Sequence, residues 1–183
     1  SCHPEGREDG RVWNFSTGAR RTQSLGGGLL ATAPFHWDGD ERHISNVMDL
    51  VYTQRMQGPQ EPQDHVASVE RFLDALPVVP RPPAVASASL AHGQALFESP
   101  DVGCTACHSG PHLTSNATVD VGTGRAFQVP SLVGVGLRAP YLHDGRAATL
   151  TDRFVNGGGD RHGHTSQLST SDVADLVGYL ETL

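Results

Sequence analysis

Cys104-Thr105-Ala106-Cys107-His108 is a C-x-x-C-H motif, and it decides how the rest of the chain is interpreted. This spacing is typical of covalent haem attachment, in which the two thiols become thioethers and the imidazole becomes the proximal iron ligand. A redox-active cysteine pair would not need the histidine. The chain has three cysteines, so a second pair that could complete a four-cysteine zinc site is missing. The motif therefore predicts that Cys104, Cys107 and His108 bind haem c.

The first residues of the sequence, Ser1-Cys2-His3, match the back half of the same motif. Three cysteines are an odd number for a disulfide framework, but the number is explained if all three are thioether positions. Cys2 and His3 are therefore predicted to bind a second haem c, with His3 as its proximal ligand. Covalent haem attachment takes place outside the cytoplasmic membrane, so we expect a protein that is periplasmic or otherwise exported.

Length and charge limit the classes of protein to consider. The 183 residues suffice for one medium or two small domains. Thirteen Lys and Arg residues against twenty Asp and Glu residues give a net charge of −7, which argues against a nucleic-acid partner. No apolar run approaches the roughly 18 residues of a membrane span. The acidic balance favours a partner with a basic surface.

Four sequence blocks occur twice in the same order, at offsets of 105 to 107 residues. The pairs are Cys2-His3 with Cys107-His108, Ser24-Leu25 with Ser131-Leu132, Ala33–Gly39 with Ala139–Gly145, and Arg71–Leu76 with Gly178–Leu183. The repeat predicts two haem-binding units, over residues 1–80 and 90–183. Between them, a stretch rich in Pro, Ala and Ser over residues 81–89 predicts an extended linker, because prolines cannot continue a helix.

Each unit is predicted to close with an amphipathic helix. In the second unit the apolar residues of 173–180 follow helical spacing, and Ser169 with Asp172 resembles a capping box. The same spacing over residues 66–76 predicts the matching helix of the first unit, with Asp64 as its N-cap. A short helix is expected over residues 90–97, immediately before the second haem motif.

The loop before the closing helix supplies the distal iron ligand in small cytochromes c. In the first unit this loop contains Met56, and adding the repeat offset of 106 leads to His162. Met56 and His162 are therefore the predicted distal ligands, with His164 as a rival to His162 and an open iron as a further alternative. The alternative for Met56 is a place in the hydrophobic core, which is the common role of a single Met. A thioether ligand raises the haem potential relative to an imidazole, so the first haem is expected at the higher potential.

Three stretches carry a resemblance to the di-haem cytochrome c peroxidase family. They are Cys104–His108, Phe127–Leu132 and Arg138–Gly145, and the first half matches through Arg21–Leu25 and Phe35–Gly39. The resemblance implies an all-α, loop-rich fold of two tandem cytochrome c-like helical domains, each built around one haem c. It also implies a calcium ion between the haems in many members.

The resemblance also bears on activity. Family members often have a tryptophan between the haems, for which Trp13 is the candidate by location. The peroxide site of the family expects a carboxylate near Asn46, where Asp49 or Glu41 would have to serve, and the catalytic residues stay unassigned. The relay haem usually takes a Met or Tyr ligand shortly after Leu150, and residues 152–157 contain neither. Electron transfer is therefore the expected function. Reduction of hydrogen peroxide with electrons from a small redox protein is the alternative.

Overall fold

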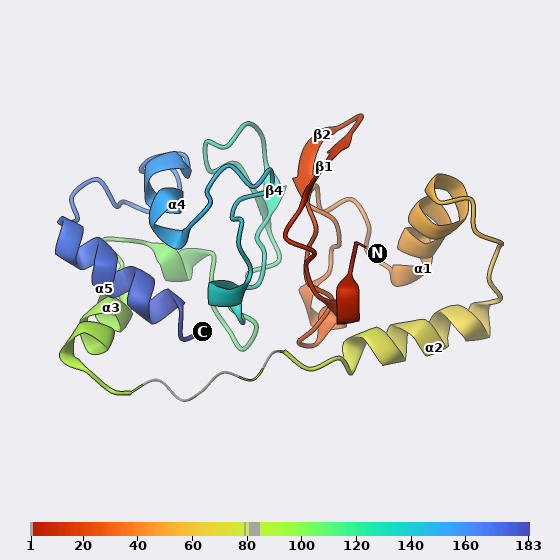
Figure 1. Cartoon of the computed structure of the whole chain (residues 1–183), viewed down its shortest axis with the longest axis horizontal. Coiled ribbons are helices and arrows are strands. Elements are labelled where there is room, and N and C mark those ends of the chain that lie inside the picture. Colours follow the sequence, from red (N-terminus) through yellow and green to blue (C-terminus); the bar gives the residue numbers. More distant parts are fainter. Residues whose placement is uncertain (1, 79, 81–84) are drawn as a thin grey trace.

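The computed structural model describes residues 2–78, 80 and 85–183. Two halves lie side by side, with helices at the two far ends and loops with two small hairpins at the boundary between them (Figure 1). The α-helices are α1 (Ile44–Val47), α2 (Gln63–Asp74), α3 (Ala88–Glu98), α4 (Leu150–Asn156) and α5 (Thr170–Leu180). Shorter helical turns are η1 (Pro4–Gly6), η2 (Leu29–Thr32), η4 (Cys104–Ala106) and η5 (Val135–Leu137), and η3 (Met48–Arg55) is a π-helix.

Two antiparallel hairpins depart from the expected all-α fold. Strands β1 (Val12–Phe15) and β2 (Gly18–Arg21) form one hairpin, and β3 (Thr118–Val119) and β4 (Phe127–Gln128) form the other. The strands have two to four residues, and every residue of β1 is exposed. Such short strands carry no alternation of apolar and polar residues that a sequence could reveal. The fold is therefore rich in helices and loops, with two small sheets.

The sequence repeat has a counterpart in the backbone. The Ala33–Gly39 and Ala139–Gly145 stretches each contain a non-glycine residue with positive φ, which is rare: 64° at His36 and 66° at Leu142. Each stretch is also closed by an isolated β-bridge, and the bridged pairs are Phe35 with Glu41 and Tyr141 with Ala147. In both halves a helical segment and then a closing helix follow, in the same order.

Helices α3 and α5 pack together and build the core of the second half. They approach so closely that a Cβ at Gly93 would lie 2.0 Å from the backbone oxygen of Asp175. The rings of Phe97 and Tyr179 lie 5.5 Å apart across the same contact. One cluster of buried residues in this core consists of Phe97, Val135, Tyr141, Ala147, Leu150, Leu176 and Leu180.

The helix boundaries confirm one predicted cap and correct another. The Ser169 and Asp172 capping box at the start of α5 is present with both of its hydrogen bonds. The N-cap of α2 is Pro62, so the prediction that Asp64 caps this helix is wrong; Asp64 lies in the first turn. Ser87 caps α3, which makes residues 88 and 89 of the predicted linker helical, while residues 81–84 of that linker lie outside the described residues.

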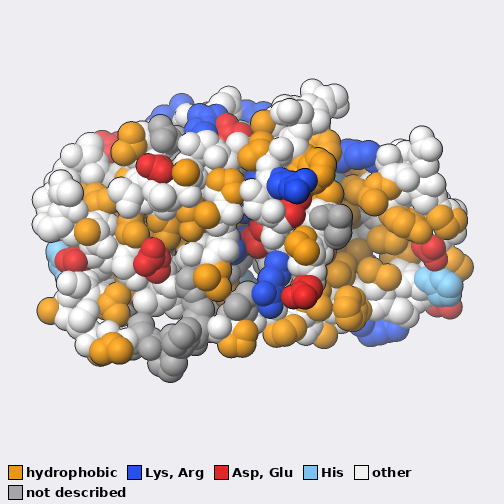
Figure 2. Space-filling view, in the orientation of Figure 1, with side chains coloured by type: hydrophobic (Ala, Val, Ile, Leu, Met, Phe, Trp, Pro, Cys, Tyr) orange, Lys and Arg blue, Asp and Glu red, His pale blue; other side chains and the backbone are white. Residues whose placement is uncertain are grey.

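Hydrogen bonds join the two halves along their boundary. The backbone N of Arg21 donates to the oxygen of His143 at 2.8 Å, and its Nε donates to the oxygen of Leu142 at 3.0 Å. Asn116 Nδ2 donates to the oxygen of Ala31 at 2.8 Å. Figure 2 shows basic and acidic side chains close to one another along this boundary. None of the helices in the described part of the chain is long and apolar enough to cross a membrane.

Candidate haem-binding site

A cavity of about 470 Å³ lies largely in the second half, and the C-x-x-C-H motif is part of its wall, with Arg21 and Trp37 of the first half lining it as well. This volume is in the range of pockets that hold small ligands and cofactors. The wall is largely apolar, with side chains from α3, α4, α5 and the loops between them. Its apolar residues include Phe97, Val102, Leu132, Val135, Leu142, Leu150, Phe154, Leu176 and Leu180. Cys104, Cys107, His108 and His162 all lie in this wall.

The backbone before the motif turns the cysteines toward the cavity. Gly103 has a φ of +81°, a conformation that favours glycine, and it begins the helical turn η4. The backbone N of His108 then donates to the oxygen of Cys104 at 2.9 Å. Both cysteines of the motif are free, and burial raises the pKa of the Cys104 thiol. The motif therefore presents two thiols and one imidazole to the same cavity.

His108 is held in the state that a metal ligand requires. Its Nδ1 lies 3.1 Å from the backbone oxygen of Leu113, and a carbonyl can only accept, so Nδ1 carries the proton. The lone pair is then on Nε2, as in many metal-ligating histidines. Burial lowers the pKa of His108 to about 4, which keeps the ring neutral at neutral pH.

His162, in the loop after α4, faces His108. The two ring centres lie 6.4 Å apart and the planes differ by 32°. Metal–nitrogen bonds of about 2 Å on both sides of one metal ion would place two imidazole centres roughly 6 Å apart. Burial, together with Arg153, lowers the pKa of His162 to about 3. Its Nδ1 is buried without a hydrogen-bond partner among the described residues. The pair therefore fits a haem iron held between the two rings.

The other predicted ligands are placed less directly. His164 lines the same cavity, and its backbone N donates a hydrogen bond to the backbone oxygen of Val102. The ring that lies against His108, however, is that of His162. In the first half Cys2 and His3 are exposed. Met56 is 67% exposed at the end of η3. Ligation by Met56, Cys2 and His3 stays a prediction.

The tryptophan at the boundary between the halves is Trp37 rather than Trp13. Trp13 lies on the exposed strand β1, where its Nε1 donates to Asp9. Trp37 is 7% exposed, its Nε1 donates to the oxygen of Arg21, and its ring lies 6.3 Å from that of His143. His143 in turn stacks on Phe127 of the cavity wall, with ring centres 3.8 Å apart. Trp37, His143 and Phe127 all line the cavity, so a chain of rings from both halves forms part of its wall.

The charged part of the wall is positive. Its four arginines, Arg21, Arg138, Arg153 and Arg161, outnumber its one acidic residue, Asp160. Burial lowers the pKa of Arg153 to about 10, and this side chain donates to the backbone oxygen of His162. Such a wall suits an anionic ligand, and haem carries two propionate carboxylates. Sequence reasoning missed these arginines, although Arg138 directly precedes the repeated Ala-Pro stretch.

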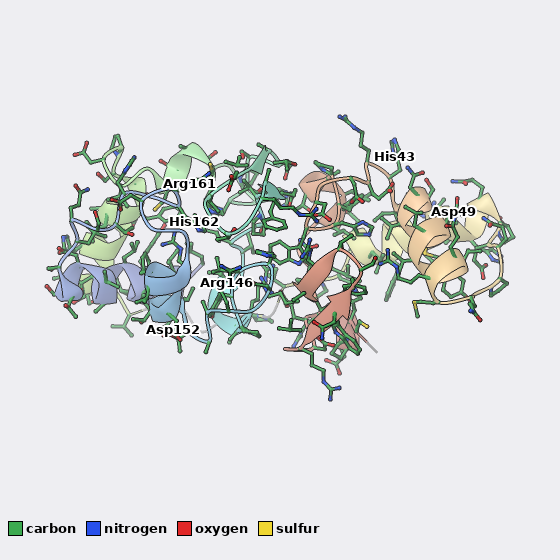
Figure 3. All side chains as sticks on the ribbon, turned by 90° about the horizontal axis from the view of Figure 1, so that it is seen from above. His43, Asp49, Arg146, Asp152, Arg161 and His162 are labelled. Carbon is green, nitrogen blue, oxygen red and sulfur yellow. The ribbon has the colours of Figure 1, made fainter. Side chains whose placement is uncertain are left out.

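The carboxylates considered for peroxide chemistry lie elsewhere. Figure 3 places Asp49 and His43 in the first half and His162 in the second. Asp49 accepts a hydrogen bond from Gln60 at 2.7 Å, and Glu41 is buried beside the Phe35 bridge. Neither carboxylate lines the cavity.

A calcium ion between the halves stays a prediction, and the small space there offers it no carboxylate. This space is lined by uncharged residues and by Arg138. Calcium takes six to eight oxygen ligands, which can be carboxylates, amide or backbone carbonyls and waters. Over the described part of the chain, no group of three or more His, Cys, Asp and Glu side chains could hold a metal ion.

Comparison with curated proteins finds distant relatives. The chain is 27% identical to hydrazine synthase subunit gamma of Kuenenia stuttgartiensis, over all of its own length and 71% of that subunit. It is 31% identical to methylamine utilization protein MauG of Methylorubrum extorquens over half of the chain and 33% of that protein. It is 29% identical to cytochrome c551 peroxidase of Nitrosomonas europaea, over 44% of the chain and 30% of that enzyme. No protein-family model matches.

Solved structures share the fold. A structure of the Kuenenia stuttgartiensis hydrazine synthase superposes with a TM-score of 0.83 at 22% identity, covering 98% of this chain and 78% of that one. A MauG-like protein associated with microbial copper homeostasis gives 0.72 at 19% identity, covering all of this chain and 80% of that one. Together with the sequence relatives, they support a distant relationship to the di-haem cytochrome c peroxidase-like proteins, and haem as the cofactor.

Proposed function

We propose that the chain is a di-haem c-type cytochrome that transfers electrons, and that the haem of its second half is held between two histidines. The observation that carries the proposal is the facing pair His108 and His162, 6.4 Å apart across a cavity that also contains both thiols of the motif. Cys104 and Cys107 would form the thioethers, His108 the proximal bond and His162 the distal bond.

Two imidazole ligands favour electron transfer over substrate chemistry. His108 and His162 would hold the haem iron from both sides and leave no room there for a small substrate, and the haem would supply one-electron redox chemistry. The protein keeps both rings neutral by burial, and the Leu113 carbonyl orients the ring of His108. Imidazole ligation also gives a lower potential than Met ligation.

The second haem belongs to the first half in this proposal, with Cys2 and His3 as its attachment residues and Met56 as its distal ligand. The repeated backbone of the two halves supports it. So does the apolar surface of the first half, which Figure 2 shows around α1 and α2 and which a haem could cover. Its exposed large apolar residues are Val12, Trp13, Phe15, Leu30, Met56, Phe72 and Val78. The whole would comprise two tandem cytochrome c-like domains.

The cellular setting follows from the same chemistry. Covalent haem attachment implies an exported, periplasmic protein, and two haems in series imply that electrons pass to or from a small redox protein. The net charge of −7 favours a partner with a basic contact surface.

Reduction of hydrogen peroxide is the second candidate. Its support is the similarity to cytochrome c551 peroxidase, which is 29% identical over the matched 103 residues. This activity needs an iron with an open position and a nearby acid. Asp49 and Glu41 lie outside the second-half cavity, whose acidic residue is Asp160, so these two carboxylates could serve only an iron in the first half.

The electronic absorption spectrum of the haem-loaded chain separates the two candidates. An electron carrier should show low-spin ferric haem that resists cyanide, and it should not turn over peroxide when supplied with a reduced cytochrome. A Cys104→Ala, Cys107→Ala double variant identifies the signal of the second-half haem. High-spin haem in this half, with fast peroxide turnover, would overturn the proposal.

A further inference from the structure

Three charged side chains are buried together at the boundary between the halves. Glu8 and Arg21 belong to the first half and Arg138 to the second, and their side chains are only 9%, 6% and 10% exposed. A carboxylate oxygen of Glu8 lies 3.8 Å from Arg21 Nη1, and the same oxygen accepts a hydrogen bond from Arg138 Nε. The group therefore has two guanidinium groups and one carboxylate.

This group has one positive charge in excess. Burying an unbalanced charge is unfavourable unless a further anion or several hydrogen bonds compensate it. Burial, and next the neighbouring Arg138, lower the pKa of Arg21 to about 10. The excess charge therefore makes this a place where an additional carboxylate would be stabilising.

Both arginines border the haem cavity, whereas Glu8 is not part of its wall. Their hydrogen bonds to the protein leave from Nε and Nη1, and none of those among the described residues uses Nη2. Arg21 donates to the oxygens of Leu142 and Thr22, and Arg138 donates to those of Ser131 and Val133. The two guanidinium groups thus line the cavity together, within reach of a ligand bound there.

The position of the arginines matches the acidic edge of a porphyrin. The vinyl groups and the propionates of haem lie at opposite edges, and the thioethers at Cys104 and Cys107 would fix the vinyl edge. Figure 1 places the Cys104–Ala106 turn away from the first half, while β2, which ends at Arg21, lies at the boundary. The propionate edge would then point toward the boundary between the halves.

We propose that Arg21 and Arg138, positioned by Glu8, form a carboxylate-binding site for the propionates of the haem in the second half. The proposal rests on the haem assignment made above. It means that an arginine of the first half binds the cofactor of the second, so the docking of the halves completes the site. Arg–carboxylate pairs of this kind are strong when both groups are shielded from water.

The site should set the haem potential through its charge. Positive charge near the iron favours the ferrous state over the ferric state, which carries one more positive charge. Arg138→Gln should therefore lower the midpoint potential of this haem. Glu8→Gln removes a negative charge from the same place and should raise it. A purely structural role does not predict shifts of opposite sign.

Redox titration of the haem-loaded full chain tests the proposal. The redox transition that disappears in the Cys104→Ala, Cys107→Ala variant is that of the second-half haem. We expect a downward shift for Arg138→Gln, an upward shift for Glu8→Gln, and a much smaller shift for Arg138→Lys, which keeps the charge. Arg71→Gln, the same change on the exposed surface of α2, is the matched control and should leave the potential unchanged.

The outcomes separate the two proposals. If the chain carries no haem at Cys104 and Cys107, the proposed function fails and the arginines have no haem to bind. If haem is present but the Arg138→Gln and Glu8→Gln shifts have the same sign, or Arg138→Lys shifts as far as Arg138→Gln, the propionate site is overturned. Acetate provides a second test of the propionate site. If acetate shifts the potential of the wild type, and shifts that of Arg138→Gln less, the arginines bind a free carboxylate instead, and the propionate site is overturned.

Discussion

The imidazole of His143 stacks on the ring of Phe127, with ring centres 3.8 Å apart and planes 23° from parallel. His143 is 8% exposed, and it links the first half to the second because its backbone oxygen accepts from Arg21. Burial lowers the pKa of His143 from its ordinary value of 6.5. Asp144 opposes this effect, while Arg20, Arg146 and Arg125 add to it.

The lowered pKa makes the stability of the protein depend on pH. Because the unfolded chain takes up this proton first, the contribution of His143 is complete above pH 6.5 and is lost as the pH falls toward the lower folded pKa. In His143→Asn, which stays neutral, acidification from about pH 7 to about pH 5 should lower the unfolding temperature less than in the wild type. If the unfolding temperatures of His143→Asn and the wild type fall equally over this pH range, the assignment to His143 is contradicted.

The two tryptophans should differ in their effect on stability. Trp37→Phe removes a buried hydrogen bond to the Arg21 carbonyl and leaves space at the boundary, so it should destabilise by about 1–3 kcal/mol. Trp13→Phe changes an exposed side chain and should stay within about 0.5 kcal/mol of the wild type. Urea unfolding curves give both values. A larger loss for Trp13→Phe would refute the placement of Trp37 at the boundary.

The close approach of α3 and α5 should tolerate no side chain at Gly93. In Gly93→Ala the new Cβ would lie 2.0 Å from the Asp175 backbone oxygen, so the helices must separate, at a cost of about 3 kcal/mol. Gly178→Ala on α5 is the matched control. Its Cβ would make an ordinary 3.7 Å contact with Leu90, and Ala favours the helix by up to about 1 kcal/mol. Chemical denaturation should show a large loss for the first variant only.

The structure brings together in one cavity four residues that the sequence had singled out, and their binding of haem stays a prediction. The motif identified Cys104, Cys107 and His108, and the repeat offset led to His162, because equal offsets keep equivalent residues at equivalent places in two similar halves. The capping box at Ser169 could also be predicted, because a capping box depends only on two residues three positions apart.

The parts that depend on distant contacts could not be predicted. Glu8 and Arg138 are 130 residues apart, and a single charged residue in an acidic chain gives no sign of burial. Trp37 and Trp13 are equally apolar, and only the docking of the halves distinguishes them. The hairpins were missed because strands of two to four residues are too short to show an alternation of apolar and polar residues.

The central claim is that His108 and His162 are the two axial ligands of one haem. The most direct measurement is the ferric absorption and electron paramagnetic resonance spectrum of the haem-loaded chain, compared between His162→Ala and His164→Ala. We expect the second-half haem to be low-spin in the wild type and in His164→Ala, and to become high-spin and bind cyanide readily in His162→Ala. A His162→Ala protein that stays low-spin, or a His164→Ala protein that becomes high-spin, would contradict the claim.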